Sequence, residues 1–444
     1  MLASFANKPT VPIRTVRLLI VVLCSVTVAA AATVPRLIDR LKDENARGQD
    51  HWIYNDLQKA LTEARRTGKP IFVTFRCVPC EACKSFDAEV ANGSHVIRDL
   101  AQTRFVSLRQ VEMKGVDLRL FQFDYDLNWA AMFINADGAV YGRYGTQSVA
   151  GPDAYNSIES LEKAMNRVLA LHEKYPDNKR ELAAKRGEPK PYRTALDMPG
   201  LENKTKFRQI TERNNCIHCH NIHDAENLQL FRLGQLTKDK LWRYPLPENV
   251  GLVIDPKDGR RIARVLPDSP AARAGINAGQ IITHVNGQPI ISIADIQWVL
   301  HNLPNTVTIL RIRLAGARGE HVLYTPAGWK LTDISWRGSL WGIPPRLRVW
   351  SAEAKGGELA RLKLPAGYGA MKVRWINVDT PEGRAAYSAG LREGDYIVAV
   401  NGRSINMNNK QFNLYVKMNY RPGDKLPVTL LRNGRFLEFM WPLK

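Results

Sequence analysis

One stretch of the sequence occurs twice in the second half of the chain. Segment 268–287, which ends in His-Val-Asn-Gly, recurs as segment 383–402, which ends in Ala-Val-Asn-Gly. Both copies contain an Ala-Gly pair typical of a helix end, a second glycine, and a closing Asn-Gly pair that favours a hairpin turn. Copies separated by about a whole domain indicate tandem modules, each with its own core. A chain of 444 residues has room for several such domains.

The repeated pattern resembles the bacterial PDZ family over residues 249–330 and 345–444. The resemblance implies two β-rich domains with capping helices. In such domains, a loop ahead of the first strand binds a peptide's terminal carboxylate, and the strand edge pairs with the peptide. The candidate peptide-binding residues of the first domain are Gly251, Leu252, Val253 and Ile254. In the second domain, segment 367–370 is the less clear counterpart, and the alternative is that either module only packs against the rest of the chain.

Cysteines form two tight clusters outside the N-terminal segment. The clusters are Cys77, Cys80 and Cys83, and Cys216 and Cys219. Structural disulfides are usually spread along a secreted chain. The two-residue spacing within each cluster therefore indicates a chemical role for these cysteines rather than a structural one.

The first cluster follows an apolar run, Ile71–Phe75, which reads as a central strand buried on both faces. Residues 52–68 read as a helix before the strand, and residues 84–90 resume a helical pattern after it. A cysteine at a strand-to-helix turn meets the helix N-terminus, where the dipole stabilises a thiolate.

Stretch 75–84 resembles the active site of the thioredoxin family, and the resemblance extends over residues 51–175. It implies an α/β domain in which Cys80 attacks and Cys83 resolves a disulfide. Cys77 is an additional thiol. Trp129 and Ala130 stand where the family carries a proline opposite the dithiol. An inert disulfide, or a thiophilic metal such as Cu(I) or Zn held by the three thiols, are the alternatives to redox chemistry.

The second cluster, with His220 directly after it, resembles the C-x-x-C-H motif that attaches haem c. The resemblance implies one covalent haem on Cys216 and Cys219, with His220 bound to the iron and Met198 as a candidate distal ligand. A zinc knuckle or a simple disulfide are the alternatives. Residues 176–248 are expected to form a linker and a short α-helical haem segment, with helical spacing over 231–242.

The N-terminus carries two arginines, an apolar stretch and an alanine run, which is typical of a secretory signal. We expect residues 1–33 to be a signal peptide or a retained membrane anchor, with Cys24 a buried apolar residue rather than a lipidation site. The rest of the chain would then be periplasmic or otherwise extracytoplasmic. The net charge of +20 is spread along the sequence, so we expect no nucleic-acid partner.

These expectations combine into a multidomain α/β and β protein, exported to the cell envelope. The leading functional hypothesis is a thiol-disulfide and electron-transfer protein that binds haem c and recognises exported partner proteins through its PDZ modules. The alternatives are a non-catalytic envelope scaffold and a haem-based sensor. Enzymatic activity stays open, with thiol-disulfide exchange the candidate. No Gly-x-Ser-x-Gly motif occurs, so we do not expect a serine protease.

Overall fold

The computed structural model describes residues 35–80 and 84–444. Contacts divide the chain into two units, Met1–Arg36 and Leu37–Lys444, and nearly all of the first lies outside the described ranges. The expected signal or anchor over residues 1–33, with Cys24, therefore lies outside the described residues. Within the described ranges, no helix combines the length and the apolar character needed to cross a membrane.

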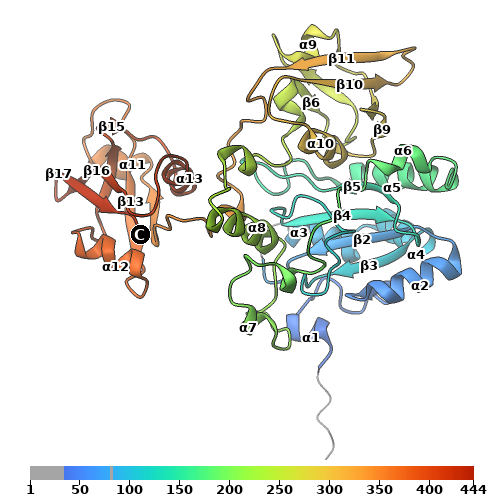
Figure 1. Cartoon of the computed structure of the whole chain (residues 1–444), viewed down its shortest axis with the longest axis horizontal. Helices are drawn as coiled ribbons and strands as arrows, with labels where there is room; N and C mark the ends of the chain where they lie inside the picture. The colour runs from blue at the N-terminus through green and yellow to red at the C-terminus, as the bar shows by residue number, and fades with distance from the viewer. Residues whose placement is uncertain (1–34, 81–83) are drawn as a thin grey trace, which may run out of the picture. The chain divides into compact units, whose positions relative to one another are not determined.

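A five-stranded mixed sheet organises the first part of the second unit, in the order β1-β3-β2-β4-β5 (Figure 1). Its strands are β1 (Trp52–Tyr54), β2 (Ile71–Arg76), β3 (Val106–Gln110), β4 (Trp129–Ile134) and β5 (Val140–Tyr144). The first three are parallel, and β4 and β5 are antiparallel to their neighbours. The helices around it are α1 (Leu37–Leu41), α2 (Leu57–Thr67), α3 (Lys84–Ala88), the π-turn η1 (Glu89–Gly93), α4 (His95–Thr103) and α5 (Ile158–Glu173).

The sheet is buried on both faces, as the apolar run at residues 71–75 predicted. Because successive side chains of a strand point to opposite faces, Ile71 and Val73 lie in one hydrophobic cluster and Phe72 in another. Alanines of α2 pack in the first cluster, while α4 and α5 supply the second. Every residue of β2 is buried.

The helix expected over residues 52–68 begins later than the apolar spacing suggested. Trp52–Tyr54 pairs with β3 instead, and the side chain of Asp56 accepts a hydrogen bond from Lys59 N to start α2. Gly68 ends the helix in the left-handed conformation, with φ of 69°. The N-cap and the strand pairing therefore override the apolar spacing of the first five residues.

Residues 176–248 are folded against the sheet rather than forming a linker. Their elements are α6 (Lys179–Ala183), η2 (Ala195–Asp197), α7 (Lys204–Phe207), α8 (His220–Arg232), η3 (Lys238–Leu241) and η4 (Pro247–Val250). The helix expected over 231–242 is wrong in position, because Gly234 turns left-handed after α8 and ends it. Met198 is fully buried in the cluster that also holds Ile71.

The first repeat folds as two small sheets, β11-β10-β8-β9 and β6-β7. Its elements are β6 (Leu252–Ile254), β7 (Ile262–Val265), α9 (Pro270–Arg273), β8 (Ile282–Val285), β9 (Gln288–Pro289), α10 (Ile293–Asn302), β10 (Thr308–Leu314) and β11 (Glu320–Thr325). The expected turns are present: Gly275 is left-handed after α9, and Asn286 and Gly287 both have positive φ between β8 and β9.

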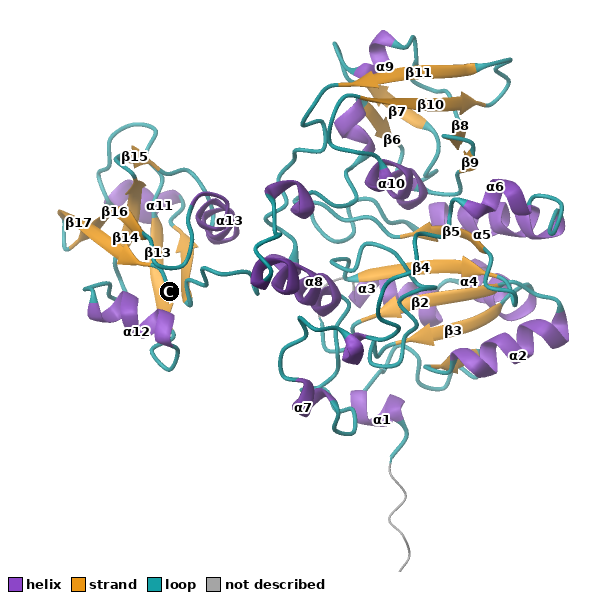
Figure 2. Ribbon diagram, viewed as in Figure 1, coloured by secondary structure: helices purple, strands orange, loops and turns teal. Residues whose placement is uncertain are grey.

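The second repeat has the same turn chemistry, with positive φ at Gly390, Asn401 and Gly402. The short helix η5 (Gly338–Leu340) precedes this repeat. The elements of the repeat are β12 (Val349–Glu353), α11 (Gly356–Arg361), β13 (Met371–Ile376), α12 (Pro381–Ser388), β14 (Tyr396–Val400), β15 (Arg403–Ser404), α13 (Asn409–Asn419), β16 (Lys425–Arg432) and β17 (Arg435–Pro442). Figure 2 shows these strands and helices by type. One apolar cluster, which includes Val373, Ile397 and Val428, fills its interior.

Helix α10 of the first repeat packs against the five-stranded sheet. The guanidinium of Arg143 on β5 lies 3.5 Å from the ring centre of Trp298, and Thr146 Oγ1 donates to Gln297 Oε1 at 2.7 Å. Residues 293–300 are all buried in consequence. The first repeat is therefore held by its helix rather than by a tether alone.

Candidate functional site

The two cysteine motifs lie side by side, although their sequence positions are 141 residues apart at the contact. Cys77 Sγ lies 2.7 Å from His218 Nδ1, which is a hydrogen bond between thiol and imidazole. A small cavity lies at this contact. Its lining includes Cys77, Cys216, His218, Cys219 and Arg76.

The first motif is placed by the end of β2. Arg76 is the last strand residue, and its Nη2 donates to Cys80 O at 2.6 Å, while Cys80 N donates to Cys77 O at 3.0 Å to close a turn. Cys80 Sγ lies 3.7 Å from Asn128 Oδ1. Strand β2 ends at Arg76 and α3 begins at Lys84, so Cys77 and Cys80 lie between a strand and a helix. Cys83 lies outside the described residues, so the paired role of Cys80 and Cys83 stays a prediction.

The second motif is fixed by the loop that follows β3. Ile217 N donates to Glu112 Oε1 at 3.0 Å, and Met113 N donates to Ile217 O at 3.3 Å. Cys219 stands at the N-cap position of α8. The motif therefore forms the turn that leads into this helix, with Ile217 buried in the sheet's apolar cluster.

Burial keeps these groups uncharged near neutral pH. It raises the pKa of Cys216 to about 11 and that of Cys219 to about 12, and it lowers the pKa of His218 to about 4. A hydrogen bond with Cys80, and then burial, raise the pKa of Cys77 above its usual value. Cys77 therefore lacks the lowered pKa that marks a reactive thiolate.

A porphyrin does not fit at the second motif. The cavity leaves about 10 Å³ for the centre of a water molecule, whereas pockets for cofactors start at about 300 Å³. The ring of His220 packs so closely on Gly338 that a Cβ there would lie 3.2 Å from its Cγ. Met198, the candidate distal ligand, is buried among apolar side chains. The expected haem ligands are thus enclosed in protein.

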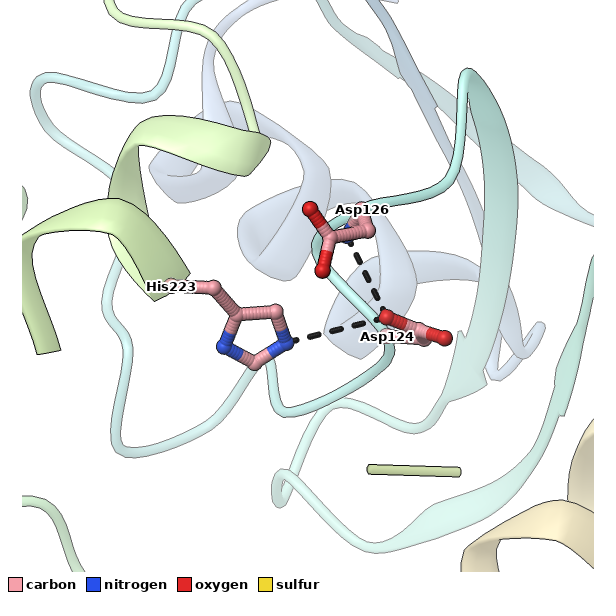
Figure 3. Close-up of side chains that lie close together, drawn as sticks. All are labelled: Asp124, Asp126 and His223. Atoms are coloured by element: carbon pink, nitrogen blue, oxygen red, sulfur yellow. Dashed lines mark hydrogen bonds and ion pairs between the residues drawn. The ribbon is translucent and has the colours of Figure 1, made fainter. Parts of the chain in front are cut away.

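A second buried polar cluster joins Asp124, Asp126 and His223 (Figure 3). Their oxygen and nitrogen atoms lie within 4.8 Å of one another, as in a metal site. Arg337, however, reaches both carboxylates, with Nη1 2.7 Å from Asp124 Oδ1 and 3.1 Å from Asp126 Oδ2. Because the guanidinium already supplies the positive charge, this cluster is an ion-pair network rather than a cation site.

The histidine of this network is oriented by its own hydrogen bonds. Tyr125 N donates to His223 Nε2 at 3.3 Å, so Nδ1 carries the proton and donates to Glu226 Oε2 at 2.9 Å. Burial alone would raise the pKa of Asp124, but the charge of Arg337 and its hydrogen bond outweigh burial and lower the pKa. Sequence reasoning missed this network, because nothing in the spacing of these residues links residue 124 with residue 337.

No serine protease triad is recorded among the described residues. His223 contacts a carboxylate, but its ring nitrogens bond to Tyr125 N and Glu226, not to a serine hydroxyl. Ser339, the serine of this network, gives its hydroxyl to Asp126 Oδ2 at 2.8 Å. The geometry described here is therefore structural and does not activate a hydroxyl nucleophile.

The predicted peptide-binding residues lie at a sheet edge. Strand β6 has β7 as its partner on one side, and no described strand pairs with its other edge. Gly251 precedes it with φ of 92°, and a Cβ at this position would collide with Ser269 Oγ. The loop therefore requires glycine here.

Comparisons with known proteins identify two of the expected domains. A thioredoxin-like family model matches residues 52–136, and a PDZ domain model matches residues 261–314. The chain carries a thioredoxin-like domain and a PDZ domain. The second repeat is not matched by a PDZ model, so its assignment stays a prediction.

The curated relatives are periplasmic serine endoproteases. The DegP-like protein of Pseudomonas savastanoi pv. phaseolicola is 31% identical over 202 residues, which cover 44% of this chain and 39% of that protein. DegQ of Escherichia coli is 29% identical over 153 residues, which cover 34% of this chain and 30% of DegQ. DegP of Escherichia coli is 43% identical over 80 residues, which cover 17% of this chain and 17% of DegP. The chain therefore spans less than half the length of the curated relatives it matches.

A solved structure, the HtrA-type protease AlgW with decapeptide, is also similar to part of the chain. It is 17% identical and covers 32% of this chain and 51% of that one, with a TM-score of 0.19. At this TM-score, the likeness supports no argument about the fold.

These relatives correct the functional expectation. The hypothesis of an exported thiol-disulfide and electron-transfer protein is contradicted, together with its alternatives of a scaffold and a haem-based sensor. The relatives are serine endoproteases and not haem-binding electron-transfer proteins. Covalent haem c as the cofactor is wrong for the same reason, and the enclosed ligands at the second motif agree. The C-x-x-C-H spacing alone was a misleading signal.

Proposed function

We propose that this chain is a periplasmic protein that binds the C-terminal segments of other exported proteins through its first PDZ domain. The periplasmic location is supported by the names of its curated relatives. We also propose that residues 249–330 and 345–444 are the two PDZ-like domains, that residues 51–175 are the thioredoxin-like domain, and that residues 176–248 join them.

The observation that carries this proposal is the open edge of β6. Leu266 N donates to Gly251 O at 2.9 Å, so the backbone of Gly251 faces β7. Because backbone groups alternate along an antiparallel strand, the N–H and C=O of Leu252 face the other way. A peptide added as an extra strand would hydrogen-bond to these groups.

The loop before β6 supports recognition of a terminal carboxylate. The turn η4 leads through Val250 into the left-handed Gly251, whose own N–H donates within the turn to Glu248 O at 3.0 Å. The N–H of Leu252, on the open edge of β6, is therefore the donor that we propose for the carboxylate. The side chain of Asn249 donates to Trp329 O at 2.9 Å and fixes the loop.

Peptide recognition by the PDZ domain is our proposal, and it rests on the geometry of β6 and of the loop before it. A partner held at β6 would lie beside a helix, α10, that is itself packed on the thioredoxin-like domain.

The test compares two peptides with the same apolar C-terminal sequence, one with a free carboxylate and one amidated. Fluorescence anisotropy with the full chain should show binding of the free acid and at least about tenfold weaker binding of the amide. Hydrogen exchange should slow at residues 250–254 on binding. Equal affinity for acid and amide, or protection confined to other strands, would reject the proposal.

A pair of variants locates the site. Gly251→Val should abolish binding, because the new side chain collides with Ser269 and distorts the loop. Gly279→Val is the matched control, since Gly279 also has positive φ but nothing lies within 4 Å of its would-be Cβ. Circular dichroism shows whether each variant remains folded, and the acid-against-amide comparison holds even if Gly251→Val does not fold.

A further inference from the structure

The second repeat carries a pocket of its own beside β12. Its lining comes from residues 341–350, from the end of β13 and from α13. The pocket leaves about 320 Å³ for the centre of a water molecule, and pockets for small ligands start at about 300 Å³. The pocket is therefore large enough for a ligand with one or two rings.

Three tryptophans line this pocket and remain open to solvent. Trp341, Trp350 and Trp375 are 45%, 51% and 52% exposed. Trp350 on β12 stands directly opposite Trp375 on β13 in the strand register. Because tryptophan is highly buried on average, three half-exposed indoles around one pocket mark a binding surface. Indole faces favour a flat ring as their partner.

The charge of the pocket is positive. Arg346, Arg348 and Lys417 line it, and no acidic residue does. Arg346 pairs with Glu202 at 3.1 Å, whereas the structure records no ion pair for Arg348 or Lys417 among the described residues. Two cations are therefore available to an anionic ligand.

The ammonium of Lys417 is held at the pocket by backbone carbonyls. Its Nζ donates to Ile343 O at 2.6 Å and to Pro345 O at 3.0 Å, which leaves one of its three N–H groups for a ligand. Burial, and then the charge of Arg346, lowers the pKa of Lys417 to about 7. The pocket thus lacks the negative charge that would keep this ammonium fully protonated.

The adjoining edge of β12 is already occupied by α13. Asn409 Oδ1 accepts hydrogen bonds from Ser351 N at 3.3 Å and from Ser351 Oγ at 2.9 Å. A peptide that added to β12 as an extra strand would need this N–H group. The ligand of the pocket is therefore compact rather than extended.

We propose that this pocket binds a compact aromatic carboxylate. The flat ring lies against the indoles of Trp350 and Trp375, and the carboxylate pairs with Arg348 and Lys417. The planar guanidinium of Arg348 matches a carboxylate with two parallel hydrogen bonds. Ring and charge act together, because an exposed ion pair alone contributes little.

The test uses 2-naphthoate and the full chain in isothermal titration calorimetry. Two comparison ligands separate the contributions: 2-naphthamide keeps the ring without the charge, and cyclohexanecarboxylate keeps the charge without a flat ring. We expect 2-naphthoate to bind with a Kd of about 1 mM or tighter, and both comparison ligands to bind at least about tenfold more weakly. Equal affinity for 2-naphthoate and its amide, or no binding of 2-naphthoate at millimolar concentration, overturns the proposal.

Matched variants locate the site. Trp350→Ala and Arg348→Met should each weaken 2-naphthoate binding at least about tenfold. Phe436→Ala and Arg435→Met are the controls, because they remove an exposed aromatic ring and an exposed arginine from β17, at the opposite edge of the same sheet. Circular dichroism shows that each variant is folded. Unchanged affinity in both pocket variants overturns the proposal.

Hydrogen exchange distinguishes a compact ligand from an extended one. A hexapeptide that ends in phenylalanine should leave exchange along residues 349–353 unchanged, because Asn409 occupies that edge. Slowed exchange along these residues would show a peptide paired with β12 and overturn the proposal. Peptide binding at β6 is followed at residues 250–254 and does not depend on this result.

Discussion

Lys185 Nζ lies 2.7 Å from Asp295 Oδ2, and only 1% of either side chain is exposed. Lys185 follows α6, and Asp295 belongs to α10 of the PDZ domain. Asp295 also accepts hydrogen bonds from the backbone N–H groups of Arg143 and Ile291. The ion pair therefore stands where the segment after the thioredoxin-like domain meets helix α10 of the PDZ domain.

Breaking this pair should be costly. Lys185→Met leaves a buried carboxylate without its counter-charge, and we expect a loss of about 3–5 kcal/mol in unfolding free energy. Lys185→Met with Asp295→Asn should recover part of the loss, because the amide oxygen still accepts from Arg143 N. Thermal unfolding followed by circular dichroism tests both. Arg66→Met, at an exposed ion pair with Glu63, is the control and should change little. A double variant no better than the single one would contradict this account.

Arg337→Met should destabilise the protein by a similar amount, about 3–5 kcal/mol, because two buried carboxylates lose their shared cation. The lowered pKa of Asp124 means that its contribution is present above the unfolded pKa of about 3.9 and is lost as pH falls through the folded pKa. The difference in unfolding free energy between wild type and Arg337→Met should therefore shrink as pH falls below about 4. Urea unfolding followed by tryptophan fluorescence measures it, and Arg313→Met, at an exposed pair with Glu320, is the control. A difference independent of pH would exclude the ionic explanation.

Asp224 on α8 should make stability fall as pH rises. Burial raises its pKa to about 7, and its Oδ1 has no recorded hydrogen-bond partner among the described residues. A group with a raised folded pKa contributes stability that is present below its unfolded pKa and is lost as pH rises through the folded one. The unfolding free energy of Asp224→Asn should therefore rise relative to that of wild type between about pH 4 and 8, by up to about 4 kcal/mol. Melting temperatures across this range give the comparison, and parallel profiles for the two proteins would rule the effect out.

Gly200→Ala should displace α8. A Cβ at Gly200 would collide with the carbonyl oxygen of Ala225 and lie 2.9 Å from Gln229 N. Overpacking of this kind costs about 1–3 kcal/mol. Gly115→Ala is the matched control, because nothing lies within 4 Å of its would-be Cβ. Thermal unfolding of both variants is the measurement, and equal stability of the two would show that α8 can shift without cost.

Local chemistry made part of this fold predictable. The unbroken apolar run at residues 71–75 could only be a strand buried on both faces, and Asn286-Gly287 could be read as a hairpin turn because both residues tolerate positive φ. Each of these signals lies within a few residues of the feature it specifies.

The contacts between distant segments could not be predicted. Nothing near Cys77 indicates that His218 would meet it, and a C-x-x-C-H spacing is compatible with a haem, a metal ion or a buried turn. The packing decided among these, because the residues around His220 leave no room for a porphyrin. Residues 52–54 were read as helix because their pairing with β3 depends on residues more than fifty positions later.

The meeting of Cys77 with His218 also bears on when the first domain is completed. A contact across 141 residues closes late, because the entropy of so long a loop must be lost before the contact forms. A chain that crosses a membrane from its N-terminus would deliver the first thiols well before their partners. In an exported chain those thiols would stay accessible to oxidants and to wrong partners until residue 219 emerged, so the order of emergence would set the interval before this contact can close.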